Sequence, residues 1–132
     1  MEPTETKLLE IKKCRPGSFV LIEDEPSTVT DLKISKPGKH GEAKARLEGI
    51  GIFDGQKRVI VKPADHNLKV PIIQKKNAQV LSITGNSAQL MDMEDYSTYE
   101  VSIPDEFKDK IIEGGEVIVW KFGNKSIIKG IR

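Results

Sequence analysis

The residues best suited to chemistry stand together in one short segment, SKPGKHGE, residues 35–42. Lys39 offers an amine and His40 an imidazole, and both lie between Gly38 and Gly41. An amine can act as a nucleophile when a neighbouring imidazole serves as the general base. A lysine at the tip of a loop can instead attract the phosphates of a nucleic acid. These two chemistries make different demands on the residues around the loop.

Catalysis by this pair is not expected. The sequence supplies no third group to orient the imidazole of His40, and His66 lies far along the chain. An exposed loop cannot lower the pKa of Lys39 by burial. Gly38-Lys39 resembles part of a P-loop, but His40 stands where that motif needs Ser or Thr, and its leading glycine is missing. We therefore expect neither an enzyme nor a metal site.

The distribution of charge favours a phosphate-rich partner. Between residues 33 and 46, five cations and one acid, Glu42, give a net charge of +4 in a chain whose total is +1. Gly38 and Gly41 strengthen this interpretation, because they can adopt positive φ and let another molecule approach closely. The alternative is a merely solvated polar loop. The five cations are Lys33, Lys36, Lys39, Lys44 and Arg46.

The elements that position the loop are predicted to be β-strands. In residues 43–48, apolar Ala43, Ala45 and Leu47 alternate with charged side chains, which is typical of a half-buried strand. Strands on both sides make residues 35–42 a hairpin loop. Up to Pro71 we expect a small, partly open barrel. Its predicted strands, separated by an acidic turn with Pro26 and an Asp54-Gly55 hairpin turn among others, comprise FVLI, STVTDLKIS, AKARLEGIGIF, RVIVKP and NLKVP.

After Pro71 the alternation restarts and predicts three strands, a short helix and two strands. Pro104 should lie just inside the helix, and Gly114 should end it. This order matches the oligonucleotide/oligosaccharide-binding (OB) barrel, with another small β-barrel as the alternative. Tyr96 and Tyr99 are candidates for stacking on bases.

Several conspicuous residues have structural interpretations. Leu47, Phe53 and Trp120 lie in apolar strand patterns, and we expect them in the barrel cores rather than against a ligand. Gly49 and Gly51 form a lone G-x-G inside a strand pattern. That arrangement indicates a bend or close packing rather than a nucleotide site.

Composition adds limits on the compartment. The chain has 132 residues, which suits one domain or two very small ones. Cys14 is the only cysteine, so we expect no intramolecular disulfide, no zinc cluster and a reducing environment. No apolar run reaches transmembrane length, and the N-terminal residues lack a signal-peptide core. These features predict a cytoplasmic protein with no membrane partner.

The stretch SKPGKHGEAKARLEGIGIF resembles the hypusine loop of the translation initiation factor 5A family, the archaeal and eukaryotic counterpart of bacterial elongation factor P. The resemblance covers essentially the whole chain, more weakly after Pro71. Pro37 and Glu42 depart from the usual eukaryotic Thr and His and look archaeal. The matching loop residues are Gly38, Lys39, His40, Gly41, Ala43 and Lys44.

The resemblance implies a mostly β protein, with an N-terminal SH3-like barrel over residues 1–70 and a C-terminal OB-fold domain over residues 71–132. It implies that Lys39 is modified by deoxyhypusine synthase, which transfers an aminobutyl group from spermidine to the lysine amine. In some members the product is then hydroxylated, and no separate cofactor is implied. The rest of the hypusine loop, 35–42, comprises Ser35, Lys36, Pro37, Gly38, His40, Gly41 and Glu42.

The resemblance also implies a translation factor, not an enzyme, that binds the ribosome near the E site. Modified Lys39 would approach the acceptor end of peptidyl-tRNA and promote peptide bond formation on stalled, for example proline-rich, sequences by positioning the substrate. The alternative is an RNA-binding module that works away from the ribosome. The residues expected to contact ribosomal RNA phosphates are Lys33, Lys36, Lys44 and Arg46.

Overall fold

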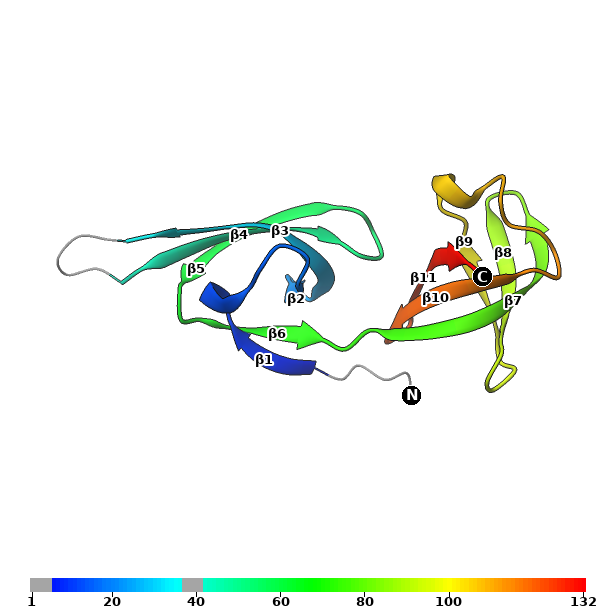
Figure 1. The fold of residues 1–132 in the computed structure, drawn as a ribbon, viewed down its shortest axis with the longest axis horizontal. Coiled ribbons are helices and arrows are strands. Elements are labelled where there is room, and N and C mark those ends of the chain that lie inside the picture. The colour runs from blue at the N-terminus through cyan, green and yellow to red at the C-terminus, as the bar shows by residue number, and fades with distance from the viewer. Residues whose placement is uncertain (1–5, 37–41) are drawn as a thin grey trace. The chain divides into compact units, whose positions relative to one another are not determined.

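The computed structural model describes residues 6–36 and 42–132, and the chain divides into two compact units between Ile72 and Ile73 (Figure 1). Each unit has its own hydrophobic core and its own β-sheets. Regular structure in the described residues is almost entirely β, as predicted, apart from two 3-10 helices of three residues each. In the same part of the chain, no helix is long and apolar enough to cross a membrane.

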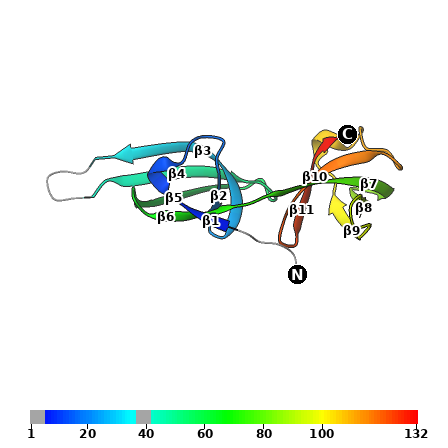
Figure 2. The same cartoon turned by 60° about the horizontal axis from the view of Figure 1, so that its bottom comes forward.

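The N-terminal unit is a curled β-domain. Its elements are β1 (Thr6–Glu10), the 3-10 helix η1 (Ile11–Lys13), β2 (Phe19–Ile22), β3 (Glu25–Ser35), β4 (Lys44–Gly51), β5 (Lys57–Pro63) and β6 (Asn67–Pro71). Strands β2-β3-β4-β5 form one antiparallel sheet in that order, and β1 pairs with β6, beside which it runs in Figure 2. Strand β1 was not predicted, whereas Pro63 and Pro71 end their strands as expected.

The core of this unit forms on the inward faces of its strands. In β4, Ala45 and Leu47 are completely buried while Lys44 and Arg46 are exposed, which confirms the predicted alternation. Phe53 is not part of that alternation, because β4 ends at Gly51, and it is only half-buried in the following turn. The buried cluster comprises Ile11, Cys14, Val20, Ile22, Val29, Ala45, Leu47, Ala64 and Leu68.

Gly49 and Gly51 allow β4 to pack closely against its neighbours. A Cβ atom on Gly49 would lie 2.7 Å from Ile22 Cδ1 and 3.1 Å from the carbonyl oxygen of Thr28. A Cβ atom on Gly51 would collide with the carboxylate of Asp54. The interpretation of this G-x-G as close packing is therefore confirmed.

The turn before β3 is tighter than predicted. Glu23 and Asp24 form it in the left-handed region, with φ of 52° and 65°. Pro26 is not in the turn but lies buried in β3, opposite Leu21. The β3–β4 ladder begins only at Ser27, so the missing N–H of Pro26 removes no hydrogen bond from that ladder.

Strands β3 and β4 form the hairpin that carries the predicted hypusine loop (Figures 1 and 2). Their pairing extends as far as Ser35 opposite Lys44. Thr30 is an extra residue in β3, at a shift of register that forms a β-bulge. Val29 before the bulge is buried, and Leu32 after it packs against the same core. The bulge therefore reverses which residues of β3 point inward.

The C-terminal unit has the strand order expected of an OB fold: three strands, a helical turn and two strands. Its elements are β7 (Gln74–Thr84), β8 (Ser87–Asp92), β9 (Thr98–Ser102), the 3-10 helix η2 (Asp105–Phe107), β10 (Glu116–Phe122) and β11 (Lys125–Ile131). They form one antiparallel sheet, β11-β10-β7-β8-β9. The long strand β7 pairs first with β10 and then with β8, and its register shifts at Leu81.

The helix predicted after Pro104 is shorter than expected. It is a single 3-10 turn, Asp105–Phe107, and Pro104 precedes it instead of lying inside it. A helix of under three turns is marginal without strong packing. Here Phe107, at the end of the 3-10 turn, and Ile111, in the irregular segment that follows, contact the core. The core of this unit comprises Ala78, Val80, Ala88, Leu90, Val101, Ile103, Ile111, Val117, Val119 and Ile128.

Asp92 is a buried carboxylate at the end of β8. Lys76 Nζ lies 3.0 Å from Asp92 Oδ2, and the backbone N–H groups of Glu94 and Asp95 donate to Oδ1 at 2.8 and 3.4 Å. Burial alone would raise the pKa of Asp92, but these N–H groups and Lys76 outweigh it and hold the pKa below its ordinary value. Asp92 therefore fixes the β8–β9 turn as an ionised group.

Candidate functional site

The candidate site is the loop end of the β3–β4 hairpin. Ser35 closes β3, and its Oγ donates a hydrogen bond to the carbonyl oxygen of Lys44, at 3.5 Å. Lys36 and Glu42 are exposed where the two strands end. The predicted loop residues that lie outside the described part of the chain are Pro37, Gly38, Lys39, His40 and Gly41.

Four charged side chains form an array on the outer face of the hairpin. Asp31 lies opposite Glu48, and Lys33 lies opposite Arg46 in the next outward-facing row. The opposite charges meet along each strand: Lys33 Nζ is 4.0 Å from Asp31 Oδ2, and Arg46 Nη1 donates to Glu48 Oε1 at 2.7 Å. Two of the four predicted RNA-contacting cations are thus already paired with carboxylates.

Glu48 is the most strongly paired acid of this array. Lys57 of β5 lies 3.7 Å from its second carboxylate oxygen. The hydrogen bond from Arg46, followed by the charges of Lys57 and Arg46, lowers the pKa of Glu48 despite partial desolvation. Glu48 therefore stays ionised at neutral pH and neutralises part of the positive charge behind the loop.

Lys36 and Lys44 differ from the other two predicted RNA contacts. Both are exposed, and no ion pair joins either of them to a carboxylate within residues 6–36 and 42–132. Lys36 directly follows the end of β3 and Lys44 begins β4, so one lies on each side of the loop root. The described cations with the greatest freedom to meet phosphate are therefore those nearest the loop.

The inward side of the hairpin root has a different character. It holds an open cavity of about 360 Å³, lined by three apolar and three charged residues. Two carboxylates against one lysine do not favour an anionic ligand. Of the described surfaces of the hairpin, the outer face with its cations is therefore better suited to phosphate than this cavity. The lining residues are Lys12, Ile34, Glu42, Ala43, Ala64 and Asp65.

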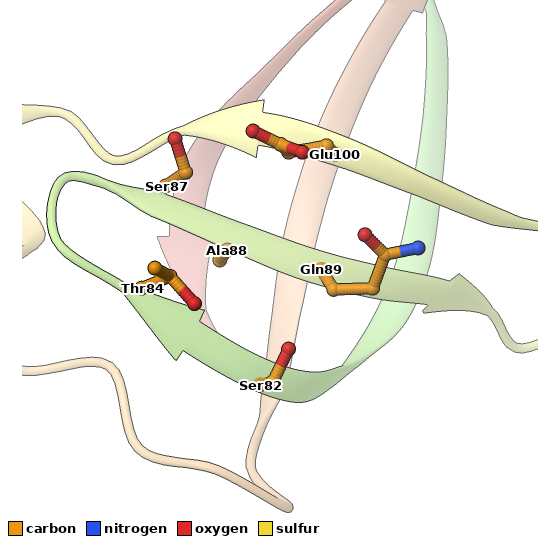
Figure 3. Close-up of a pocket in the computed structure, with 6 residues that line it drawn as sticks. All are labelled: Ser82, Thr84, Ser87, Ala88, Gln89 and Glu100. Atoms are coloured by element: carbon orange, nitrogen blue, oxygen red, sulfur yellow. The ribbon is translucent and has the colours of Figure 1, made fainter.

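The second and third strands of the OB domain, β8 and β9, carry the face that OB folds commonly use for ligands. Here that face has a shallow cavity of about 240 Å³, in which Ser82, Gln89 and Glu100 lie side by side on β7, β8 and β9 (Figure 3). Its lining contains hydroxyl groups, an amide and one carboxylate, with no aromatic ring and no cation. Such a surface offers a nucleic acid no ring on which to stack a base and no positive charge for its phosphates. The complete lining is Ser82, Thr84, Ser87, Ala88, Gln89 and Glu100.

Trp120 lies on a different face, and its predicted place in the core is wrong. Along β10 it alternates with buried Val117 and Val119, so its half-buried indole is on the outer side. Lys75 Nζ of β7 lies 5.0 Å from the centroid of the indole, and Lys129 Nζ of β11 lies 4.9 Å from it. These distances are typical of cation–π contacts.

The two tyrosines proposed for stacking are not on that face. Tyr99 packs against the core, with Lys121 Nζ 3.9 Å from its ring centroid. Tyr96 is 67% exposed in the loop after β8. Two signals for the actual arrangement were present in the sequence. The Asp31-x-Lys33 and Arg46-x-Glu48 spacings place opposite charges on one strand face. Trp120 stands one residue after Val119 and three after Val117, which places it on the face opposite to both.

Family comparisons agree with the two β-domains. Residues 4–66 match the family described as translation initiation factor 5A-like, N-terminal. Residues 72–132 match the family described as eukaryotic elongation factor 5A hypusine, DNA-binding OB fold. The fold, the hairpin and these matches together define a two-domain translation factor.

Individual relatives narrow this class. A translation initiation factor 5A of Archaeoglobus fulgidus is 53% identical over 83% of this chain and 86% of its own length, and that of Methanobrevibacter smithii is 52% identical over 94% and 97%. The solved structure of the Methanococcus jannaschii factor has a TM-score of 0.85 at 38% identity, covering 96% of this chain and 95% of its own. The chain belongs to the translation initiation factor 5A family.

Proposed function

We propose that the chain binds the ribosome near the E site and promotes peptide bond formation at stalled sequences through a modified Lys39. The observation that carries the proposal is the family match, which includes a hypusine-type OB domain, together with a hairpin of paired strands whose loop sequence contains Lys39. In this function the protein is a cytoplasmic translation factor that positions a substrate and is not itself an enzyme.

The hairpin suits this task mechanically and electrostatically. Strand pairing that extends to Ser35 and Lys44 holds the root of the loop in a defined geometry. Lys36 and Lys44 flank that root as exposed cations. They would hold ribosomal RNA phosphates on either side of the tip, while Lys39 reaches toward peptidyl-tRNA.

Modification of Lys39 by deoxyhypusine synthase completes the proposed function. An added aminobutyl group lengthens the side chain and supplies a second amine. A slender polycation can enter a space lined by RNA phosphates that a folded loop cannot enter. Whether the residue carries hypusine or deoxyhypusine is read directly from the intact mass of the protein purified from its native host.

Reconstituted translation of a proline-rich reporter tests the proposal. We expect modified protein to relieve stalling, and Lys39→Arg to fold and to associate with ribosomes but fail to relieve it, because a guanidinium cannot accept the aminobutyl group. Lys36→Arg is the matched control, since it keeps a cation at the loop root and leaves Lys39 intact. Equal rescue by modified protein, unmodified protein and Lys39→Arg would place the function elsewhere in the chain.

A further inference from the structure

We propose that the outer face of β7, β10 and β11 is a second nucleic-acid site, which binds single-stranded RNA with a base stacked on Trp120 and phosphates held by Lys75 and Lys129. The site belongs to the OB domain and does not involve the hairpin loop. It shares only β7 with the polar face of Ser82, Gln89 and Glu100, and Lys75 and Ser82 lie toward opposite ends of that strand. The description of the domain family mentions DNA binding but does not say which residues bind.

Strand pairing brings the three side chains together. Trp120 lies opposite Lys75 on one side and opposite Ile127 on the other. Directly paired residues of antiparallel strands share a face. Lys129 joins them through a β-bulge, because the register shifts between Ile128 and Gly130. The bulge places Lys129 beside the indole, as the distance of 4.9 Å shows.

The chemistry of this arrangement fits single-stranded RNA. Any base can stack on an indole without sequence preference, and flanking lysines track the backbone. The two ammonium groups sit about 5 Å from the ring in the free protein. This contact holds them beside the stacking surface, where the phosphates of a bound strand would draw them away from it. Bases within a duplex are already stacked and closed to such a ring.

The neighbouring residues agree with a polyanionic partner. The adjoining outward-facing pairs are Phe122 with Lys125, and Ile118 with Asn77 and Gly130. These rows supply another aromatic ring and another cation, and they contain no carboxylate. The polar face on β8 and β9 offers the reverse composition, with Glu100 and hydroxyl groups. Of the two outer faces, the one around Trp120 is therefore the one suited to nucleic acid.

Trp120 is the only tryptophan in the chain, so its fluorescence reports on this face alone. We expect an oligouridylate of about eight nucleotides to quench that fluorescence at low salt, with an affinity that falls as salt is added. Duplex RNA of the same length should produce little quenching. The full-length protein is used throughout, so that binding at the hairpin loop remains possible while the fluorescence of Trp120 is followed.

Variants then assign the binding. Measured by anisotropy of a labelled oligouridylate, Trp120→Ala should weaken affinity about 5- to 150-fold and Trp120→Phe should retain most of it. The double variant Lys75→Gln/Lys129→Gln should weaken binding and flatten its salt dependence. Ser82→Ala/Gln89→Ala, on the polar face, is the matched control and should bind normally. Circular dichroism establishes that each variant is folded.

Three results would overturn the proposal. The first is no oligouridylate binding at low salt. The second is binding that neither quenches Trp120 nor responds to Trp120→Ala, which would place RNA on the hairpin alone. The third is loss of ribosome association in Trp120→Ala without any oligouridylate binding by the original protein, which would indicate a protein partner for this face. None of these results bears on Lys39, so the function proposed for the loop is tested separately.

Discussion

Asp31 and Glu48 lie directly opposite each other across the β3–β4 ladder, and each is paired with a cation two residues away on its own strand. Like charges in directly opposed positions repel, so neither row of the array is favourable by itself. The along-strand pairs with Lys33 and Arg46 relieve that repulsion. Two acids and two cations leave the array without net charge, and the positive charge of the hairpin is therefore concentrated nearer its tip.

This arrangement predicts unequal effects of removing charge. The double reversal Lys36→Glu/Lys44→Glu should weaken ribosome binding and flatten its dependence on salt. With fewer phosphate contacts, fewer counterions are released on binding. Lys33→Glu/Arg46→Glu changes charge equally but should weaken binding less, since those cations already sit beside Asp31 and Glu48. Ribosome co-sedimentation across a salt series compares the two. Equal losses would contradict the division of the hairpin into a neutral array and a basic tip.

Glu48→Gln should have the opposite effect on ribosome affinity. It removes the carboxylate that holds Arg46 at 2.7 Å and Lys57 at 3.7 Å, and it adds one positive charge to the outer face. We expect tighter ribosome binding with a steeper salt dependence. The free energy of unfolding should change by no more than about 1 kcal/mol, because the pairs are near the surface. Weaker binding by a folded Glu48→Gln protein would show that the ion pairs position Arg46 for RNA instead of withholding it.

Asp92 predicts a dependence of stability on pH. Its pKa is lowered in the folded state, so its contribution is present above the pKa of the unfolded chain and is lost as pH falls through the folded value. The pKa of Lys76 is raised, chiefly by its hydrogen bond to Asp92, so the contribution of Lys76 disappears only at strongly alkaline pH. Asp92→Asn should cost about 1–3 kcal/mol at neutral pH and reduce the loss of stability on acidification. Urea unfolding of both proteins at neutral and acidic pH measures this, and parallel pH profiles would count against it.

Gly49 predicts a steric limit in the N-terminal core. Gly49→Ala should lower the free energy of unfolding by about 1–3 kcal/mol, because the new methyl group meets Ile22 and the backbone of Thr28. Gly130→Ala is the matched control, since its Cβ would lie 3.7 Å or more from its neighbours, at ordinary contact distance. Denaturant unfolding monitored by circular dichroism should distinguish the two. Similar stabilities would mean that β4 has room to shift away from β2.

The two separate cores predict that each unit can fold alone. Fragments 1–72 and 73–132 should each give a dispersed amide NMR spectrum, because their buried clusters share no residue. Both fragments should be less stable than typical larger domains, since chains of about 60–70 residues bury a small fraction of their surface. Limited proteolysis of the full chain should cut near Pro71. A fragment that remains unfolded in the presence of the other would show that the division is not a domain boundary.

Much of the fold was predictable because strand alternation reports directly on burial. Ala45 and Leu47 in β4, and Val117 and Val119 in β10, occupy the faces that period two assigns to them. Strand β1 was missed because a five-residue strand whose first three residues are exposed shows little alternation. The helix after Pro104 was overestimated, since capping signals mark where a helix starts but do not supply the packing that sustains it.

The candidate site was predictable in its location but not in its electrostatics. The count of cations pointed to residues 33–46, yet it could not show that Lys33 and Arg46 meet acids on the same strand face. Trp120 was placed in the core because apolar neighbours surround it in sequence. However, successive residues of a strand point to opposite faces, so Trp120 points outward next to the buried Val119. Its two lysines come from β7 and β11, and only the strand order brings them beside the ring.

The bulge at Thr30 determines the direction of the hairpin. A bulge bends and twists its strand, so Thr30 sets the direction in which β3 and β4 leave the barrel. From Asp31 to Ser35 the strand extends about 14 Å, which makes a lever arm: each 10° of bend moves the loop root by about 2 Å. Deleting Thr30 would leave Val29 and Leu32 facing the core and every charge of the hairpin in place. The loop would keep its residues, but the hairpin would leave the barrel in a different direction.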